Sequence, residues 1–415
     1  MTRKGTIFVM LLMAVVLVVA SVASAEPIKI RMYYGVGGAV GELIQELADE
    51  FNATRSDIEV EVAFQGSYDE TANKVMADLA GGFNPDLAQI SLANVPQFIG
   101  REELLIDLNS VFEEDVLDDF IPALVDAGTF DGKFYAAPFN VSTLLFYWNK
   151  ELFEEAGLDP ERPPQDWDEM REYARILTKG DRLGLAMFGP PYDHWVLESL
   201  YWQNGGNMLS EDGTKVVVDS PASIEALEFI DTLVNEDKTA TYVPNAESNH
   251  LLLSQRVAMN YASTGALGNF WENADFEFGA GHLPRGPVGK FTSLGGGFLI
   301  MFSSTPEREA AAREFLEFLT TTENTVKMNM RTGYLPSRQS AQETAELQQY
   351  WEEVPAAKAA VTQLPYAVAR RNHPKLKEIH DIIARMMNSS IVESVTTPAE
   401  AARRAAQEGN LALLF

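Results

Sequence analysis

Cysteine is absent from the 415-residue chain, and basic residues are scarce. The absence of cysteine excludes disulfide bonds, thiolate nucleophiles and cysteine-ligated zinc or iron–sulfur sites. Only 32 basic side chains stand against 60 acidic ones, which gives a formal net charge of -28. Nucleic acids and anionic lipid headgroups repel a protein of this charge, so we expect neither as a partner.

Motifs that would indicate an enzyme are also missing. The five histidines show no H-E-x-x-H spacing, and neither a G-x-S-x-G elbow nor a G-x-x-x-x-G-K-[ST] phosphate loop occurs. A near match to G-x-G-x-x-G begins at Gly35, but Val40 stands where the third glycine belongs. We therefore predict no cofactor, no metal and no catalysis. Adjacent carboxylates such as Glu113 and Glu114 leave a secreted glycoside or phosphodiester hydrolase as the alternative.

One long apolar run is present, at the N-terminus. It covers residues 7–20, follows Arg3 and Lys4, and ends shortly before the small residues Ala23–Ala25. This pattern is typical of a cleaved secretory signal peptide, with Glu26 as the first residue of the exported protein. A lipoprotein would need a cysteine there, so we expect a periplasmic protein without a lipid anchor. Without Arg3 and Lys4, 30 basic and 60 acidic residues remain, a charge of -30.

The rest of the chain has a globular composition, with 46% hydrophobic and 22% charged residues. Its periodicity predicts strands at residues 28–34, 58–64 and 86–91, separated by helices at residues 40–51 and 70–79. This βαβαβ order predicts a parallel, doubly wound sheet. The fold class is therefore α/β.

A second α/β unit follows. Residues 144–148 and 257–262 have the pattern of strands, and residues 306–319 form a clearly amphipathic helix. We expect the chain to cross between the two units near Phe139 and near Ala262.

Aromatic residues beside turn residues are the main positive sign of a binding site. Flat rings stack on the C–H faces of sugars and polyols, and nearby hydroxyls and amides bind their OH groups. We expect two or three members of the following set in the site: Tyr68, Trp195, Trp202, Trp271 and Tyr334.

Several short motifs, in this order, resemble the extracellular solute-binding proteins of carbohydrate-type ABC importers, most of all the glycerol-3-phosphate-binding members. The resemblance covers nearly all of the chain after the signal peptide. It is carried by Gly66–Thr71, Pro138–Thr143, Ala156–Glu161, Pro163–Pro164 before Trp167, Ala262–Gly265, Gly295–Gly296 and Thr332–Pro336.

This resemblance implies a two-lobed periplasmic binding protein fold, in which each lobe is a sheet flanked by helices. After the signal peptide (residues 1–25), lobe 1 would comprise residues 26–138 and about 265–318. Lobe 2 would comprise residues 139–264 and about 319–415. The lobes would close on a small hydroxylated solute, and the protein, a monomer, would deliver that solute to an ABC permease in the inner membrane.

The resemblance also implies a set of solute-binding residues. The family's pocket tryptophan falls at His194 or at the adjacent Trp195. The full set is Tyr68, Ser142, His194, Trp195, Ser263, Gly296, Tyr334 and Arg370.

Two departures from the family pattern bear on the solute. Leu92 stands where the family has an acidic residue that holds glycerol hydroxyls, and leucine cannot accept a hydroxyl proton. Ala369 stands where the family has a phosphate-contacting arginine, with Arg370 and Arg371 next in the chain. We therefore expect a sugar or polyol first, and glycerol 3-phosphate or a glycerophosphodiester as the alternative.

Overall fold

The structure is a computed structural model that describes residues 26–99, 104–191, 194–370 and 373–414. The predicted signal peptide (residues 1–25) and Arg371 lie outside the described residues. Among the helices of the described residues, none combines the length and the apolar character needed to cross a membrane.

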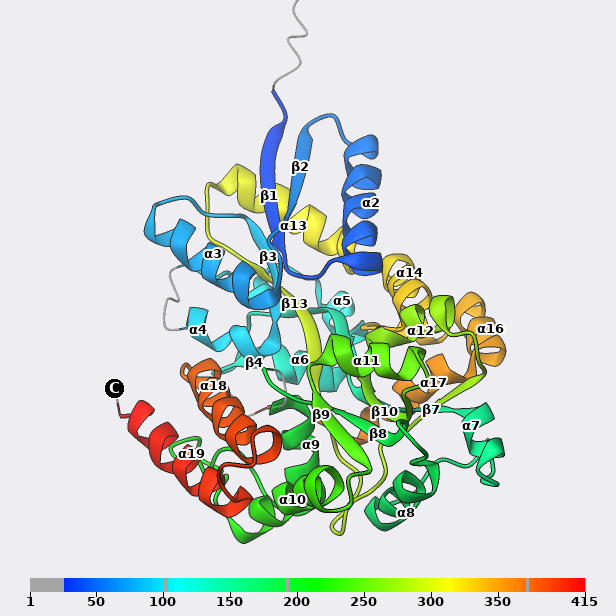
Figure 1. Cartoon of the computed structure of the whole chain (residues 1–415). Helices are drawn as coiled ribbons and strands as arrows, with labels where there is room; N and C mark the ends of the chain where they lie inside the picture. Colours follow the sequence, from blue (N-terminus) through cyan, green and yellow to red (C-terminus); the bar gives the residue numbers. More distant parts are fainter. Residues whose placement is uncertain (1–25, 100–103, 192–193, 371–372, 415) are drawn as a thin grey trace, which may run out of the picture.

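Two five-stranded sheets organise the molecule, one in the upper and one in the lower half of Figure 1. The strands of the first sheet, in spatial order, are β2 (Ile58–Phe64), β1 (Ile28–Tyr34), β3 (Leu87–Ser91), β13 (Gly295–Met301) and β6 (Ala137–Ser142). The strands of the second sheet are β11 (Phe278–Gly281), β7 (Leu144–Asn149), β10 (Val257–Ser263), β8 (Leu183–Phe188) and β9 (Ala240–Val243). Two short pairs join β4 (Thr129–Phe130) to β5 (Lys133–Phe134) and β12 (Thr292–Ser293) to β14 (Ala367–Val368).

The predicted α/β fold class and the opening βαβαβ order are confirmed. Strands β1, β2 and β3 run parallel, and α2 (Gly38–Thr54) and α3 (Tyr68–Ala80) connect them. The other two strands of this sheet, β13 and β6, are antiparallel to their neighbours. The second sheet is also mixed, because β8, β9 and β10 are parallel while β7 is antiparallel to both of its neighbours, β10 and β11.

Helices cover the sheets (Figure 1). Those around the first sheet, besides α2 and α3, are α4 (Pro96–Ile99), α5 (Glu114–Asp119), α6 (Pro122–Gly128), α13 (Pro306–Leu319) and α14 (Thr322–Thr332). The remaining helices are α7 (Lys150–Glu155), α8 (Trp167–Leu177), α9 (His194–Gln203), α10 (Pro221–Asp231), α11 (Asn245–Leu253), α12 (Leu267–Asn273), α15 (Gln339–Gln342), α16 (Ala345–Glu353), α17 (Pro355–Thr362), α18 (Leu376–Met387) and α19 (Pro398–Ala412). An apolar cluster that includes Ile44, Leu47 and Phe315 packs α2 and α13 against the first sheet, as their amphipathic patterns require.

The chain passes from the first sheet to the second at Thr143, the single residue between β6 and β7. This is close to the crossing expected near Phe139. The chain then stays in the second sheet through β11 and returns with β13, so the return lies after Gly281 and not near Ala262. The reason is that β11 pairs with β7, although the sequence analysis assigned its residues to lobe 1. Otherwise the lobe boundaries stay a prediction.

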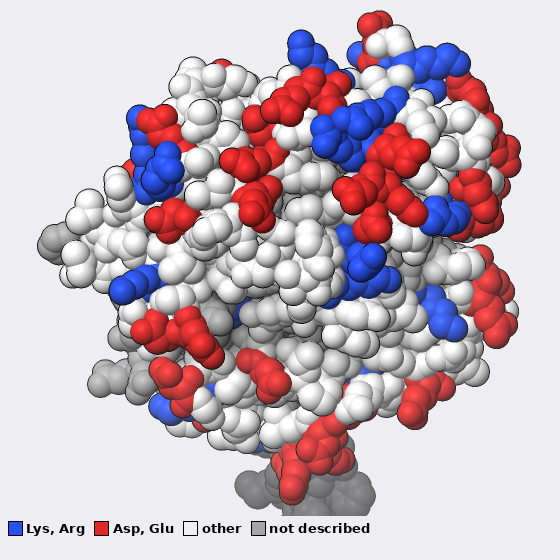
Figure 2. All heavy atoms as spheres, turned by 90° about the horizontal axis from the view of Figure 1, so that it is seen from below, with Lys and Arg blue, Asp and Glu red and all other residues white. Residues whose placement is uncertain are grey.

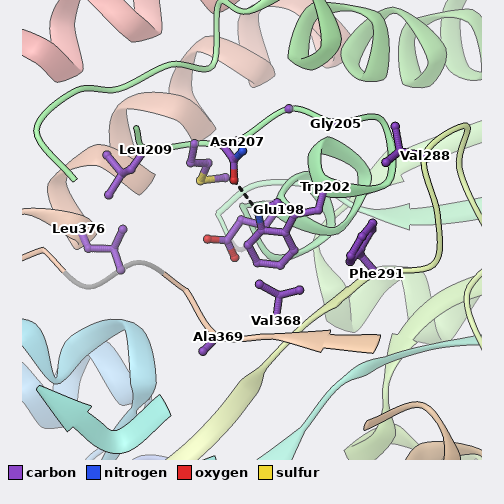
Figure 3. Close-up of a pocket in the computed structure, with 12 residues that line it drawn as sticks. Glu198, Trp202, Gly205, Asn207, Leu209, Val288, Phe291, Val368, Ala369 and Leu376 are labelled. Carbon is purple, nitrogen blue, oxygen red and sulfur yellow. Dashed lines mark hydrogen bonds between the residues drawn. The ribbon is translucent and has the colours of Figure 1, made fainter. Parts of the chain in front are cut away.

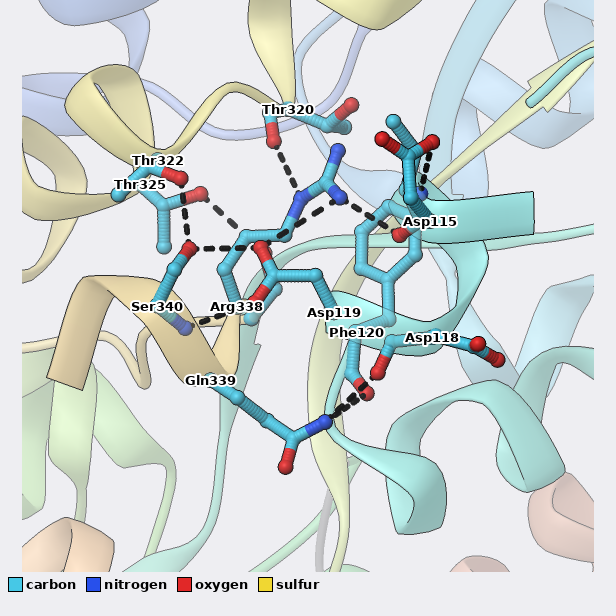
Figure 4. Close-up of polar contacts among 12 residues, drawn as sticks. Asp115, Asp118, Asp119, Phe120, Thr320, Thr322, Thr325, Arg338, Gln339 and Ser340 are labelled. Atoms are coloured by element: carbon cyan, nitrogen blue, oxygen red, sulfur yellow. Dashed lines mark hydrogen bonds and ion pairs between the residues drawn. The ribbon is translucent and has the colours of Figure 1, made fainter. Parts of the chain in front are cut away.

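The segment after α14 is fixed to the first half of the molecule by a buried arginine (Figure 4). Arg338 Nε donates to the Thr320 carbonyl (2.8 Å), and Nη1 donates to the Val116 carbonyl (2.7 Å). The guanidinium carbon lies 4.0 Å from the centroid of the Phe120 ring. These contacts hold the strand-like stretch that carries Tyr334.

Candidate solute-binding cavity

A cavity of about 750 Å³ lies between the two sheets. Its floor is built where parallel strands end, since Gly35, Tyr68 and Ser91 follow or close β1, β2 and β3. On the opposite side, Phe188 and Ser263 close β8 and β10. Ligands of open α/β sheets bind at the carboxyl ends of their strands, so this is the expected place for a site.

All eight predicted site residues line this one cavity. They are Tyr68, Ser142, His194, Trp195, Ser263, Gly296, Tyr334 and Arg370. That each of them contacts a solute stays a prediction.

The five aromatic residues named in the sequence analysis lie in different places, and that two or three of them bind a solute stays a prediction. Tyr68, Trp195 and Tyr334 line the cavity, whereas Trp271 is 60% exposed on the surface. Trp202 lines a second cavity instead.

Tyr68 is placed by a helix start. Gly66 has a φ of +102°, and Ser67 accepts a hydrogen bond from the Glu70 amide (3.2 Å) as the N-cap of α3. Tyr68 is therefore the first residue of α3 and faces the cavity.

A chain of buried amides then holds the Tyr68 hydroxyl. The Gly35 amide donates to Gln89 Oε1 (2.9 Å), Gln89 Nε2 donates to Asn140 Oδ1 (2.7 Å), and Asn140 Nδ2 donates to the Tyr68 hydroxyl oxygen (2.9 Å). Because a backbone amide can only donate, Gly35 determines the orientation of both side-chain amides. Sequence reasoning missed Gln89, and it included Asn140 in a motif without giving it a role.

The ring of Trp195, in α9, lies against Gly295 of β13 in the first sheet. A Cβ atom on Gly295 would lie 2.7 Å from the Trp195 ring, so only glycine admits the ring in this position. Trp195 Nε1 also donates to the Ser293 carbonyl (2.9 Å). The ring is thus held on two sides.

Arg370 forms a buried ion pair with Glu198 of α9. Glu198 Oε2 accepts from Arg370 Nε and from the Ser293 hydroxyl (2.9 Å). Burial raises the pKa of Glu198, while Arg370 and Ser293 oppose that rise. Sequence reasoning gave no sign of Glu198, because one glutamate among 60 acidic residues carries no distinguishing pattern.

Two histidines stack in the same wall. The ring centroids of His194 and His380 are 3.9 Å apart and their planes differ by 9°. Burial lowers the pKa of both well below the usual value, so both are neutral at neutral pH. His380 also lines the cavity and was not predicted.

The rim carries an ion pair between the two sides of the cavity. Lys377 Nζ of α18 lies 3.6 Å from Asp69 Oδ2 of α3 and 2.5 Å from Asp381 Oδ1. Helix α18 also packs against the 3₁₀ helix η1 (Leu92–Asn94), which follows β3. The structure therefore has direct contacts across the cavity mouth.

Neither Leu92 nor Ala369, the two departures from the family pattern, lines the solute cavity. Leu92 is buried and does not line the cavity, whereas its neighbours Ser91, Ala93 and Asn94 do. Ala369 lines the second cavity, and Arg370 lines the first.

The second cavity, of about 500 Å³, is lined in part by Glu198 and Trp202 of α9 (Figure 3). Trp202, Phe291, Val368 and Leu376 form mostly apolar walls around the Glu198 carboxylate. Glu198 and Arg370 thus lie between the two cavities. No group of three or more acidic or histidine side chains suited to a metal ion occurs within residues 26–99, 104–191, 194–370 and 373–414.

A cavity between two mixed α/β sheets, with aromatic and hydroxyl groups on both walls, defines a two-lobed binding protein. The chain belongs to the bacterial extracellular solute-binding proteins, whose family model matches residues 46–356. It is the solute-binding component of an ABC importer.

Curated relatives support this assignment over most of the chain. The sn-glycerol-3-phosphate-binding periplasmic protein UgpB of Pectobacterium atrosepticum is 26% identical over 415 residues, covering 92% of this chain and 91% of the relative. UgpB of Escherichia coli K12 is 28% identical over 411 residues, with coverage of 92% and 91%.

Solved structures are similar along the whole fold. UgpB of Mycobacterium tuberculosis in complex with glycerophosphocholine has a TM-score of 0.82 at 26% identity, covering 94% of this chain and 98% of that one. The cyclic alpha-maltosyl-1,6-maltose binding protein of Arthrobacter globiformis has a TM-score of 0.81 at 25% identity, with coverage of 93% and 99%. The predicted two-lobed fold is confirmed.

Proposed function

We propose that this protein binds a neutral hydroxylated solute, a sugar or polyol, in the cavity between its sheets and delivers it to an ABC permease in the inner membrane. The observation that carries the proposal is the combination of aromatic rings and hydroxyl groups with paired charges. Tyr68, Trp195 and Tyr334 offer ring surfaces, and Ser142 and Ser263 offer hydroxyls. This is the chemistry that recognises the C–H faces and OH groups of a sugar.

The charges of the cavity support a neutral solute. Both of its cationic side chains in the described residues, Arg370 and Lys377, have carboxylate partners. On the face shown in Figure 2, Lys and Arg side chains likewise lie beside Asp and Glu and form no continuous basic area.

Glycerol 3-phosphate or a glycerophosphodiester is the second candidate. The relatives named UgpB bind such compounds by their printed names, and Arg370 lies in the cavity as a cation. A hydrolase is not supported, because the similar proteins are binding proteins.

The mechanism is closure of two lobes on the solute. A solute that contacts both walls favours the closed form by the difference between its affinities for the closed and the open forms. The Asp69–Lys377 contact and the packing of α18 against η1 bridge the two walls. The permease would recognise the closed form of a monomeric receptor.

Export with cleavage before Glu26, and the absence of a lipid anchor, complete the proposal. Sequencing the N-terminus of the exported protein should give Glu26. An intact Met1 on membrane-bound protein would contradict it.

The test begins with a thermal-shift screen of sugars, polyols and phosphate esters. A solute at 100 times its dissociation constant stabilises the fold by about 2.7 kcal/mol. Titration calorimetry of the best solute then compares Tyr68→Ala and Trp195→Ala with wild type. Each removed ring should cost about 1.5–3 kcal/mol of binding free energy, which is roughly tenfold or more in affinity.

Trp202→Ala is the matched control. Trp202 belongs to the same helix as Trp195, but it lines the second cavity. Its replacement should leave the affinity near the wild-type value. If Trp202→Ala abolishes binding while Tyr68→Ala and Trp195→Ala do not, the solute occupies the other cavity.

A further inference from the structure

The ion pair between Arg370 and Glu198 separates the two cavities. Arg370 is 6% exposed and Glu198 is 3% exposed, so water screens neither charge well. Arg370 lines the proposed solute cavity, while the Glu198 carboxylate lies behind it, within the apolar walls that Figure 3 shows. Glu198 does not line the solute cavity.

Two hydrogen bonds stabilise the charged form of Glu198 in this position. One carboxylate oxygen accepts from Arg370 Nε and from the Ser293 hydroxyl. The other lies 3.9 Å from His380 Nε2. The carboxylate therefore lies in contact with the guanidinium, on the side away from the solute.

The remaining cation of the cavity is also compensated. Lys377 lies within 4 Å of Asp69 and Asp381, and both carboxylates line the cavity. An anionic solute consequently meets at least as many negative as positive charges among the described residues. A phosphate group gains most from cations that are free to form charge-assisted hydrogen bonds with it, and the carboxylate partners of Arg370 and Lys377 compete for those bonds.

We propose that Glu198 determines the charge class of the solute: by neutralising Arg370 from behind, it lets the cavity accept neutral hydroxylated solutes and disfavours phosphate esters. This inference rests on the proposed function, since it assigns the specificity of the same cavity. Glu198 acts through Arg370 and is a positioning residue. Its loss should change the preference between anionic and neutral solutes, an effect that a purely structural residue would not produce.

The test is Glu198→Gln, which keeps the shape of the side chain and its ability to accept hydrogen bonds from Arg370 and Ser293. The probes are sn-glycerol 3-phosphate and inorganic phosphate, measured by titration calorimetry at low and high salt. We expect the variant to bind glycerol 3-phosphate at least tenfold more tightly than wild type. The gain should shrink at high salt, because it depends on an uncompensated charge.

Asp381→Asn is the matched control. Like Glu198→Gln it removes one negative charge, but this charge lines the cavity and pairs with Lys377 and not with Arg370. Its affinity for glycerol 3-phosphate should rise less than threefold over that of wild type. The double variant Glu198→Gln/Arg370→Gln should lose the gain altogether, and thermal unfolding of each variant verifies that it is folded.

Three results would overturn the inference. Wild type would bind glycerol 3-phosphate as tightly as Glu198→Gln, or Glu198→Gln would bind neither probe, or Asp381→Asn would gain as much as Glu198→Gln. If Glu198→Gln does not fold, the folded double variant decides. It lacks both charges and should bind the neutral solute as wild type does, without any gain for glycerol 3-phosphate, and a tenfold gain for glycerol 3-phosphate in the double variant would overturn the inference. The proposed function fails separately, if no sugar or polyol in the screen stabilises wild type.

Discussion

The two walls of the cavity are built in different ways. The wall on the first sheet uses neutral groups: backbone amides and glycines around Tyr68, connected through the buried amides of Gln89 and Asn140. The wall on the second side uses buried ionisable groups: the Arg370–Glu198 pair and the stacked rings of His194 and His380.

The two walls therefore differ in role: the neutral wall directs hydrogen bonds, and the other wall carries buried charges. A chain of neutral amides directs hydrogen bonds at small energetic cost, because each group has a partner. A buried ion pair is sensitive to the loss of either member, since the remaining charge is left without water or partner. We therefore expect substitutions on the charged wall to affect stability most, and substitutions on the neutral wall to affect affinity.

The largest effect is expected from Arg370→Ala. It leaves the buried Glu198 carboxylate uncompensated, which should lower the free energy of unfolding by about 3–5 kcal/mol. Urea denaturation measures this. Arg313→Ala is the control, because Arg313 pairs with exposed acids and should cost at most about 1 kcal/mol. Equal losses of unfolding free energy in both variants would show that the buried ion pair stabilises the fold no more than a surface ion pair does.

Asn140→Leu tests the neutral wall. It breaks two buried hydrogen bonds and leaves Gln89 without an acceptor, so we expect a loss of about 1–3 kcal/mol in stability together with weaker solute binding. Asn52→Leu also breaks two hydrogen bonds of the first sheet, to the backbone of Val60 and far from the cavity. Asn52→Leu should lower the free energy of unfolding and leave the affinity for the solute unchanged. A loss of affinity in both variants would rule out a specific role for the amide chain.

The stacked histidines predict a pH dependence of stability. Burial lowers the pKa of His380 in the folded protein, so the unfolded chain binds protons more readily in mildly acidic solution. The stability that neutral His380 contributes is present above the unfolded pKa of about 6.5 and is lost as the pH falls. Between pH 7 and pH 5.5 we expect a loss of about 1 kcal/mol for each buried histidine.

His380→Leu should remove its share of that loss. Denaturation curves at several pH values, for wild type and the variant, measure the difference. Parallel pH profiles would mean that His380 does not titrate in this range.

The smallest effect is expected at the rim. Asp69 and Lys377 are partly exposed, with side-chain exposures of 30% and 36%, so Lys377→Met should change the apparent affinity by at most about 1 kcal/mol, and less at high salt. Lys375→Met is the control, since Lys375 pairs with Glu378 three residues along the chain. A larger loss in the control would place the effect in α18 itself and not in the contact between the walls.

The sequence predicted residues of both walls, but not the buried partners that hold them. Strand and helix periodicity gave the parallel order of β1 to β3, whose ends form the floor. Short motifs identified Tyr68 and Tyr334, because turn residues leave local patterns. The partners of Arg370 and Tyr68 lie 172 and 72 residues away in the sequence, so no local pattern reveals Glu198 or Asn140 as their partner.

The return crossing was misplaced for a similar reason. The strand-like stretch at β11 has no feature that assigns it to one sheet, and its pairing with β7 is a long-range contact. The order of strands in mixed sheets depends on such contacts.

The most decisive measurement is a crystal structure of the protein with the solute that the thermal-shift screen identifies. We expect an uncharged, hydroxylated molecule between Tyr68 and Trp195, with Arg370 still paired with Glu198. Solute in the second cavity beside Trp202, or a phosphate group bound to an Arg370 that has left Glu198, would contradict it.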